Sequence, residues 1–212
     1  MTINQIITGF NLQVSDTTEL STSEEFIVAN RVYTKICNNR PWEWLKTSIA
    51  GIILSDAAGF YITLPTDFAY ITENNSYTLN NESINNNTAA KVIFVGSNYS
   101  PYQLINYSDR RQYRDKIGYV YLDITNNKLV FTSTPEALTY EFDYIKVPPT
   151  LVTGDTPVFP ARFHDIIVYG MAVDDQIIQL SPKASSYAAE NQAKYKSCMD
   201  DLMYWNAQLI QM

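Results

Sequence analysis

The most constraining feature of this 212-residue sequence is that its hydrophobic spacing changes twice along the chain. Near the start, apolar residues recur at three- and four-residue steps, as they do on one face of a helix. From about Ile49 to Lys146 they form short β-branched and aromatic runs separated by turn residues, and helical spacing then returns. We therefore expect helices at both ends of the chain and strands in the middle.

The first expected helix spans residues 21–40. Ser21 or Ser23 serves as its N-cap, and Glu24 and Glu25 place carboxylates in its first turn. Side-chain oxygens at the cap accept free backbone N–H groups, and negative charge favours the positive end of the helix. The start of the chain before this helix is polar, so we expect it to form an arm.

Two more helices are expected after a proline-rich extended approach that begins near residue 147. One spans 161–180, and the last spans 185–212. The last helix carries a seam at alternating four- and three-residue steps, typical of a helix that packs along its length. The seam residues are Asn191, Tyr195, Cys198, Leu202, Trp205, Leu209 and Met212.

The middle of the chain predicts an antiparallel β region. Its clearest hairpin is YVYLDITNNKLVFT, where Asn126 and Asn127 tolerate positive φ between two strand-like runs. A further strand alternates apolar and polar residues, as a half-buried strand does. Its apolar positions are Leu138, Tyr140, Phe142 and Tyr144.

Together these patterns predict an α+β fold in which N- and C-terminal segments form a helical bundle with an inserted antiparallel β domain. The expected divisions are 1–48, 49–146 and 147–212. Residues 74–88 lie in an Asn-rich polar stretch that buries too little apolar surface to order itself, so we expect a mobile loop. The loop is either a surface excursion or an arm that orders against a neighbouring subunit.

The charge balance disfavours tight binding to nucleic acid. The chain has 15 Lys and Arg against 22 Asp and Glu, a formal net charge of −7, which repels phosphate backbones and anionic lipid. One local exception is SDRRQYRDK, where Arg110 and Arg111 sit among tyrosines. This run is either a single-strand binding patch or, since Asp109 and Asp115 dilute it, a solvated turn or subunit contact.

Targeting signals are not evident in the sequence. No stretch approaches the roughly 20 uninterrupted apolar residues of a membrane helix, and the N-terminus lacks the charged-then-apolar order of a signal peptide. We therefore expect a protein that is made and kept in a cytoplasm, with no membrane partner.

No catalytic or cofactor-binding pattern emerges. His164 is the only histidine, and its place beside an aromatic residue at a helix start favours capping or packing over general-base chemistry. The two cysteines are expected to be reduced core residues. The adjacent acidic pairs at 174–175 and 200–201 diverge on their helices, so we expect solvated faces and not metal ligands. With 7 glycines and no phosphate-cradling loop, we expect no cofactor, no metal and no enzyme.

The order of several segments resembles that of bacteriophage head-tail adaptor (connector) proteins, including the tail-tube adaptor rings of short-tailed phages. The matching segments are ANRVYTKI, PWEWL, YITLPTDF from Tyr61 to Phe68, GYVYLDITNNKLVFTSTP, YEFDYIKVPPTL and PVFPARFHDIIVYGMAVD, followed by an amphipathic helix. The similarity spans about Ser21 to the C-terminus and rests on segment order. The Asn-rich character also resembles proteins of crAss-like phages.

This resemblance implies a virion protein at the head-tail junction or tail, assembled in the host bacterial cytoplasm. It implies a homo-oligomeric ring, commonly of twelve copies, that contacts the portal protein and other tail or ring proteins. Genomic DNA would pass through the lumen without sequence-specific binding.

The candidate interface residues are mostly aromatic, because aromatic rings bury much area with little loss of rotamer entropy. Ordinary core packing is the alternative for each, above all for the two on the last helix. The candidates are Tyr99, Tyr102, Tyr107, Arg110, Arg111, Tyr113, Trp205 and Leu209.

Two other classes of protein compete with this interpretation. Another phage tail structural protein, or a receptor- or carbohydrate-binding module, would also be rich in Tyr and Asn, but such modules are usually dominated by β repeats and do not need three helices. An enzyme would need convergent carboxylates or a metal site.

Overall fold

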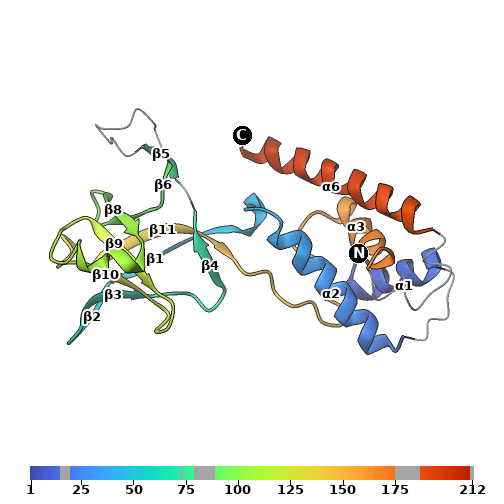
Figure 1. Cartoon of the computed structure of the whole chain (residues 1–212), viewed down its shortest axis with the longest axis horizontal. Helices are drawn as coiled ribbons and strands as arrows, with labels where there is room; N and C mark the ends of the chain where they lie inside the picture. Colours follow the sequence, from blue (N-terminus) through green and yellow to red (C-terminus); the bar gives the residue numbers. More distant parts are fainter. Residues whose placement is uncertain (15–19, 73, 79–88, 175–186, 211–212) are drawn as a thin grey trace. The chain divides into compact units, whose positions relative to one another are not determined.

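The computed structural model describes residues 1–14, 20–72, 74–78, 89–174 and 187–210 (Figure 1). The chain divides into two compact units. We name residues 1–45 and 148–212 the helical unit and residues 46–147 the strand-rich unit. The fold is therefore α+β, and the strand-rich unit is inserted in sequence between the two parts of the helical unit.

The start of the chain differs from the expected polar arm, because Ile3–Val14 form helix α1. Its buried residues follow three- and four-residue steps and so share one face. They are Ile3, Ile6, Ile7, Phe10 and Val14. The polar residues that suggested an arm, such as Asn4 and Thr8, are exposed on the other faces.

Helix α2 (Thr22–Asn38) confirms the predicted start, with Ser21 at the N-cap. The backbone N–H of Ser21 donates to Glu24 Oε2 at 2.8 Å, which closes a capping box. The pKa of Glu24 is lowered because the side chain and backbone of Ser21 donate hydrogen bonds to its carboxylate. The first turn is thus stabilised by the residues that the sequence singles out.

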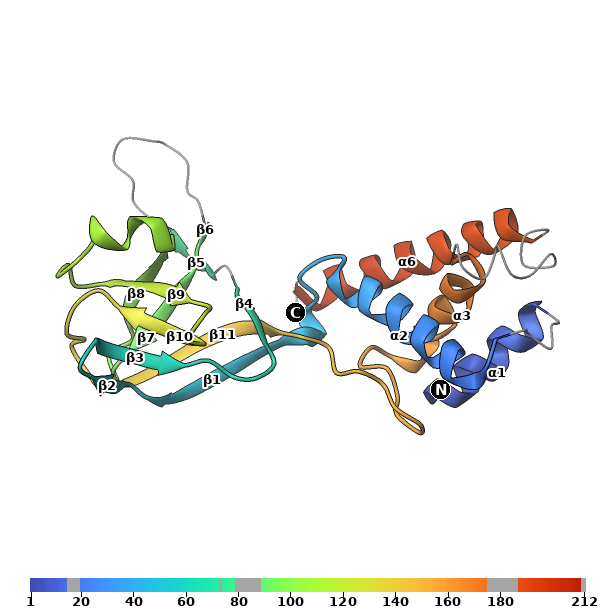
Figure 2. The same cartoon turned by 60° about the horizontal axis from the view of Figure 1, so that its bottom comes forward.

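Helix α3 (Asp165–Ala172) contacts the three other described helices of its unit and is their common neighbour (Figures 1 and 2). It follows the short 3-10 helix η3 (Ala161–Phe163), close to the expected start at residue 161. The expected helix continued to residue 180, but the observed one ends at Ala172, and residues 175–180 lie outside the described residues.

Helices of this unit approach one another closely at Gly170. A Cβ atom added there would lie 2.5 Å from Val32 Cγ1 on α2 and 3.0 Å from the ring of Tyr195 on helix α6 (Ala188–Ile210). Ordinary carbon contacts are about 3.5–4.0 Å. Glycine therefore lets helices from the two ends of the chain approach α3 together.

Helix α6 buries the predicted seam only in part. Asn191 and Leu202 are buried, whereas the other described seam residues are partly exposed and residue 212 lies outside the described residues. Two buried amides tie the helix to its unit: Asn191 Oδ1 accepts from Gln13, and Asn206 Oδ1 accepts from the backbone N–H of Glu43, each at 2.9 Å.

The strand-rich unit holds a nine-stranded sheet. The strands are β1 (Lys46–Ile52), β2 (Leu54–Asp56), β3 (Gly59–Thr63), β4 (Phe68–Ile71), β7 (Val92–Val95), β8 (Ser100–Ile105), β9 (Tyr119–Asp123), β10 (Lys128–Phe131) and β11 (Thr139–Lys146). The order is β1-β11-β7-β8-β9-β10-β3-β2, with β4 also pairing β11. Since only Ile53 separates the two end strands β1 and β2 in the chain, the sheet is nearly closed.

The expected antiparallel pairing holds for every pair in this sheet except one. Strands β9 and β10 form the predicted hairpin, with Asn127 at φ 51° in its turn. By contrast, β8 and β9 are parallel. Parallel neighbours cannot be joined by a tight turn and need a crossover connection. Residues 106–118 make that connection, and we name them the crossover segment.

Most of the apolar positions predicted for strand β11 lie in the core of the strand-rich unit. Tyr140, Phe142 and Tyr144 are buried, but Leu138 lies before the strand and is 55% exposed. Strands β1 and β11 pair over their whole common length, from Lys46 opposite Ile145 to Ile52 opposite Thr139. The longest pairing in the unit therefore joins residues about 90–100 positions apart in the sequence.

The expected mobile loop at 74–88 is described only at its start. Residues Asn74–Thr78 form strand β5, which pairs with β6 (Ala89–Ala90) in a separate two-stranded sheet. Residues 79–88 lie outside the described residues, so the arm hypothesis stays a prediction. Among the helices that the structure describes, none has the length and apolar character needed to cross a membrane.

Candidate interface surfaces

Four of the candidate interface residues lie on the crossover segment. Tyr107, Arg110 and Arg111 belong to the 3-10 helix η2 (Tyr107–Arg111), and Tyr113 follows it. The sequence grouped these residues by composition. In the structure they lie on the connection that the parallel pairing of β8 and β9 requires.

Two tyrosines of the crossover segment pack on strand β9. The Tyr107 ring meets Tyr121 edge-on at a centroid distance of 5.6 Å, and Tyr113 lies 4.5 Å from Tyr119. The Arg110 guanidinium lies 3.8 Å above the Tyr107 ring and donates to the Tyr107 carbonyl at 2.7 Å. Tyr107 is still 49% exposed, so its ring anchors the segment on β9 and also leaves part of its surface accessible to a partner.

The far end of the crossover segment is fixed by backbone hydrogen bonds. Asp115 adopts a positive φ of 63°, and its N–H donates to the Thr132 carbonyl at 2.9 Å. The Thr132 hydroxyl donates to the Lys116 carbonyl at 2.6 Å. The segment is therefore held at both ends, and its side chains are presented from a defined backbone.

Tyr99 and Tyr102 occupy different environments although they are close in sequence. Tyr99 is 58% exposed, with a positive φ of 53°, and packs edge-on against Phe94. Tyr102 is only 1% exposed, and its hydroxyl accepts the N–H of Glu136 at 3.0 Å. Tyr102 is thus a core residue of the strand-rich unit, and of the two only Tyr99 offers surface.

In the helical unit, Trp205 is part of an aromatic cluster. Its ring stacks on Trp44 at 5.6 Å and lies 5.7 Å from Phe163. Trp205 is partly exposed, as is Leu209. The packing alternative accounts for the contacts of Trp205. Tyr204 was not among the predicted interface residues, although it is 70% exposed; it is not one of the seam residues of its helix.

His164 is fully buried in the helical unit, as its expected packing role requires. Its Nε2 lies 2.8 Å from the Phe159 carbonyl oxygen and its Nδ1 lies 2.8 Å from the Met1 nitrogen. Burial lowers the pKa of His164, because desolvation disfavours the charged ring more than the hydrogen bond to Phe159 favours it, and the positive charge of the N-terminus lowers the pKa further. A neutral ring held in this way packs against Phe159.

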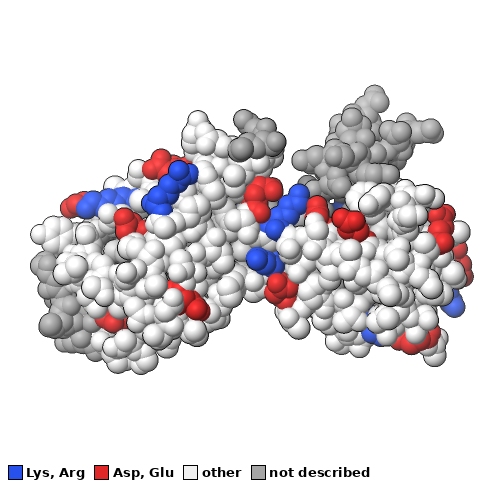
Figure 3. Space-filling view, turned by 180° about the vertical axis from the view of Figure 1, so that it is seen from behind, with Lys and Arg blue, Asp and Glu red and all other residues white. Residues whose placement is uncertain are grey.

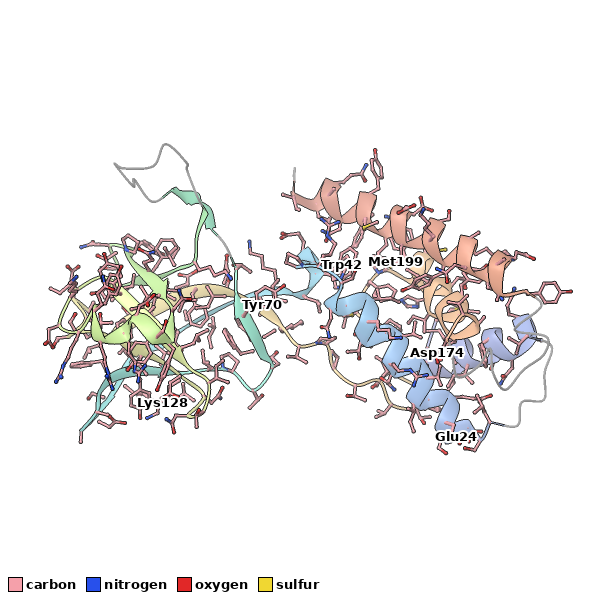
Figure 4. The ribbon with its side chains drawn as sticks, viewed as in Figure 1. Glu24, Trp42, Tyr70, Lys128, Asp174 and Met199 are labelled. Atoms are coloured by element: carbon pink, nitrogen blue, oxygen red, sulfur yellow. The ribbon has the colours of Figure 1, made fainter. Side chains whose placement is uncertain are left out.

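The two cysteines are free; Cys37 is buried as expected, whereas Cys198 is only partly buried and is not a core residue. Burial raises the pKa of the Cys37 thiol to about 12, so the residue behaves as a small apolar side chain. The expectation of a solvated face at Asp174 is wrong. Asp174, which is labelled in Figure 4, is 8% exposed and forms a two-point ion pair with Arg31. That partner lies 143 residues away, beyond the reach of local patterns.

No metal site is evident in the described ranges, where no three His, Cys, Asp or Glu side chains gather to hold an ion. On the face shown in Figure 3, acidic and basic side chains are scattered over a largely uncharged surface. What these surfaces offer is aromatic and arginine groups on a fixed backbone, which is the composition of protein interfaces.

The model of one protein family, SU10 adaptor protein, matches residues 1–210. The chain belongs to this family. Membership confirms the resemblance to phage adaptor proteins, and the match includes the N-terminal residues that the resemblance left out. No curated protein matches the chain. Membership implies that the chain interacts with other phage structural proteins.

Proposed function

We propose that this chain is a structural subunit of a bacteriophage head-tail adaptor and not an enzyme. The observation that carries the proposal is the match of the adaptor family over residues 1–210. Because the match covers both units, the proposal applies to the whole chain and not to one part of it.

In this proposal the subunits form a homo-oligomeric ring, commonly of twelve copies, between the portal protein and the tail. Each copy presents one face to a different face of the next, and the helices from both chain ends act as a bundle that forms the body. Genomic DNA passes through the lumen. The net charge of −7 per copy supports a wall to which DNA does not adhere.

The proposal places the subunit in the virion after assembly in the host bacterial cytoplasm. The Asn-rich composition supports an origin in a crAss-like phage. The surfaces that we propose for subunit contact are the exposed tyrosines at 99 and 107, the arginines of η2 and the outer side of α6 near Leu209.

Mass photometry and negative-stain imaging of the purified protein, alone and with its portal protein, test the proposal. We expect rings of uniform diameter in at least the portal-containing sample. The double substitution Tyr99→Ser and Tyr107→Ser is expected to reduce ring formation without unfolding the chain, because both rings are about half exposed.

The matched control is Tyr187→Ser, which removes a tyrosine of similar exposure, 47%, from the helical unit. Rings that form equally well in all three proteins would show that the two tyrosines are not interface residues. A chain that stays monomeric with and without the portal protein would contradict the ring itself.

A further inference from the structure

A cavity of about 450 Å³ opens beside the crossover segment in the strand-rich unit. Three arginines line one side of it: Arg110, Arg111 and Arg114. Most of the other lining residues come from around the β2–β3 turn and the end of β10 and include Phe60 and Ser133. Three arginines therefore line one space in a chain whose net charge is negative.

Little in the described part of the chain balances these charges. Arg110 donates one hydrogen bond to the Tyr107 carbonyl, which carries no net charge. Arg114 lies 3.9 Å from Asp115, but both side chains are more than four-fifths exposed, so water screens this pair. Among the described residues, no carboxylate forms an ion pair with Arg110 or Arg111. Three arginines line the cavity against one carboxylate, Asp115, and this excess of positive charge favours a bound anion.

The other walls suit an anionic side chain with an apolar stem. The Ser133 hydroxyl is buried and has no hydrogen-bond partner among the described residues, so it is free to donate to an oxyanion. Phe60 and Tyr121 add aromatic surface. The arginines supply planar forks that match the two oxygens of a carboxylate.

We infer that this cavity binds carboxylate side chains presented by a second copy of the chain. The inference rests on the proposed ring, which brings copies together. Each copy has seven more acidic than basic residues, so the chain itself is a source of the required groups. The cavity then forms one side of a subunit contact and orients neighbouring copies.

Acidic residues around the cavity favour a protein carboxylate over a nucleic acid. Asp115 lines the cavity itself and Asp109 belongs to the crossover segment. A neighbouring cavity that shares Phe60 is lined by Asp123 and by Asp56, which pairs with Lys128. A continuous phosphodiester chain would pass these negative groups and be repelled. A single acidic side chain brings only one negative charge to the three arginines, and in the cavity lining it meets one carboxylate, Asp115.

The first test uses the isolated full chain and a fluorescent, end-capped tetraglutamate peptide. We expect saturable, salt-sensitive binding by anisotropy. The triple substitution Arg110→Gln, Arg111→Gln and Arg114→Gln is expected to weaken it about tenfold or more. The control substitutions remove three positive charges from the helical unit: Arg162→Gln, Lys194→Gln and Lys196→Gln. This control should bind the peptide like the unmodified chain, with both variants folded by circular dichroism.

An oligonucleotide of equal charge separates the two classes of ligand. Tighter binding to the oligonucleotide than to the peptide, or equal peptide binding by both triple variants, overturns the assignment of the cavity. Neither result depends on ring formation. If rings form while the peptide fails to bind, this inference fails and the proposed function stands.

The second test identifies the source of the carboxylate. Arg111→Lys introduces an amine that a carbodiimide joins to a carboxylate in direct contact. In rings mixed from ¹⁴N- and ¹⁵N-labelled chains, we expect cross-links from position 111 to acidic residues of the other isotope. Arg162→Lys is the matched control. Three results would overturn the second copy as the source of the carboxylate: cross-links confined to one isotope, no cross-links in assembled rings, or a chain that does not self-associate.

Discussion

Gly170 gives the sharpest test of how the two ends of the chain pack together. In Gly170→Ala the added methyl group would lie 2.5 Å from Val32 Cγ1, about 1 Å closer than an ordinary carbon contact. Val32 is 3% exposed and β-branched, so its side chain has little freedom to turn away. Overpacking of this kind costs about 1–3 kcal/mol.

Gly9→Ala is the matched control. Both glycines lie inside helices, so each substitution gains about 1 kcal/mol in helix propensity. At Gly9 the new methyl group would lie 3.5 Å from Val168 Cγ2, an ordinary contact. The difference in unfolding free energy between the two variants therefore isolates the steric cost at Gly170, about 1–3 kcal/mol.

Urea denaturation followed by tryptophan fluorescence measures this difference. The chain has three tryptophans, Trp42, Trp44 and Trp205, all in the helical unit, so the signal reports that unit alone. We expect Gly9→Ala to match or exceed the unmodified chain in stability and Gly170→Ala to fall below it. Equal stability of the two variants would refute the close approach of α2, α3 and α6.

Three further predictions follow from buried polar groups. Arg31→Ala should lower the unfolding free energy by about 1–3 kcal/mol in the same assay, because it removes the main partner of the buried Asp174 carboxylate. Tyr102→Phe should cost about 1 kcal/mol, the value of a lost hydrogen bond from Glu136, and should leave ring formation unchanged. Because the pKa of His164 is lowered from 6.5 in the folded chain, the unfolded chain binds a proton first as the pH falls. The free energy of unfolding should therefore be at its full value above pH 6.5 and decrease below it. His164→Gln should reduce this dependence of stability on pH.

The features that the sequence predicted correctly are encoded locally. The cap at Ser21 is read from adjacent residues, and the hairpin turn at Asn127 is read from two asparagines between β-type runs. Helix α1 was encoded equally well, with Ile3, Ile6 and Phe10 on one face. It was missed because the polar residues between them dominate the local composition.

The features that the sequence could not supply depend on distant pairings. The sequence near residues 106–118 does not predict that β8 and β9 are parallel. This pairing nevertheless positions the crossover segment and its arginines beside one cavity. The burial of Asp174 depends on Arg31 in another helix. Tyr102 and Tyr107 have similar sequence surroundings, and only the sheet decides that one is core and the other surface.

We propose that many copies of this chain form a closed ring at the head-tail junction. Cryo-electron microscopy of intact particles of the phage that encodes the chain tests it most directly. We expect a rotationally symmetric ring between portal and tail whose density accommodates the helical unit and the strand-rich unit in every repeat. Particles that lack this chain, or that carry it as single copies away from the junction, would contradict the claim.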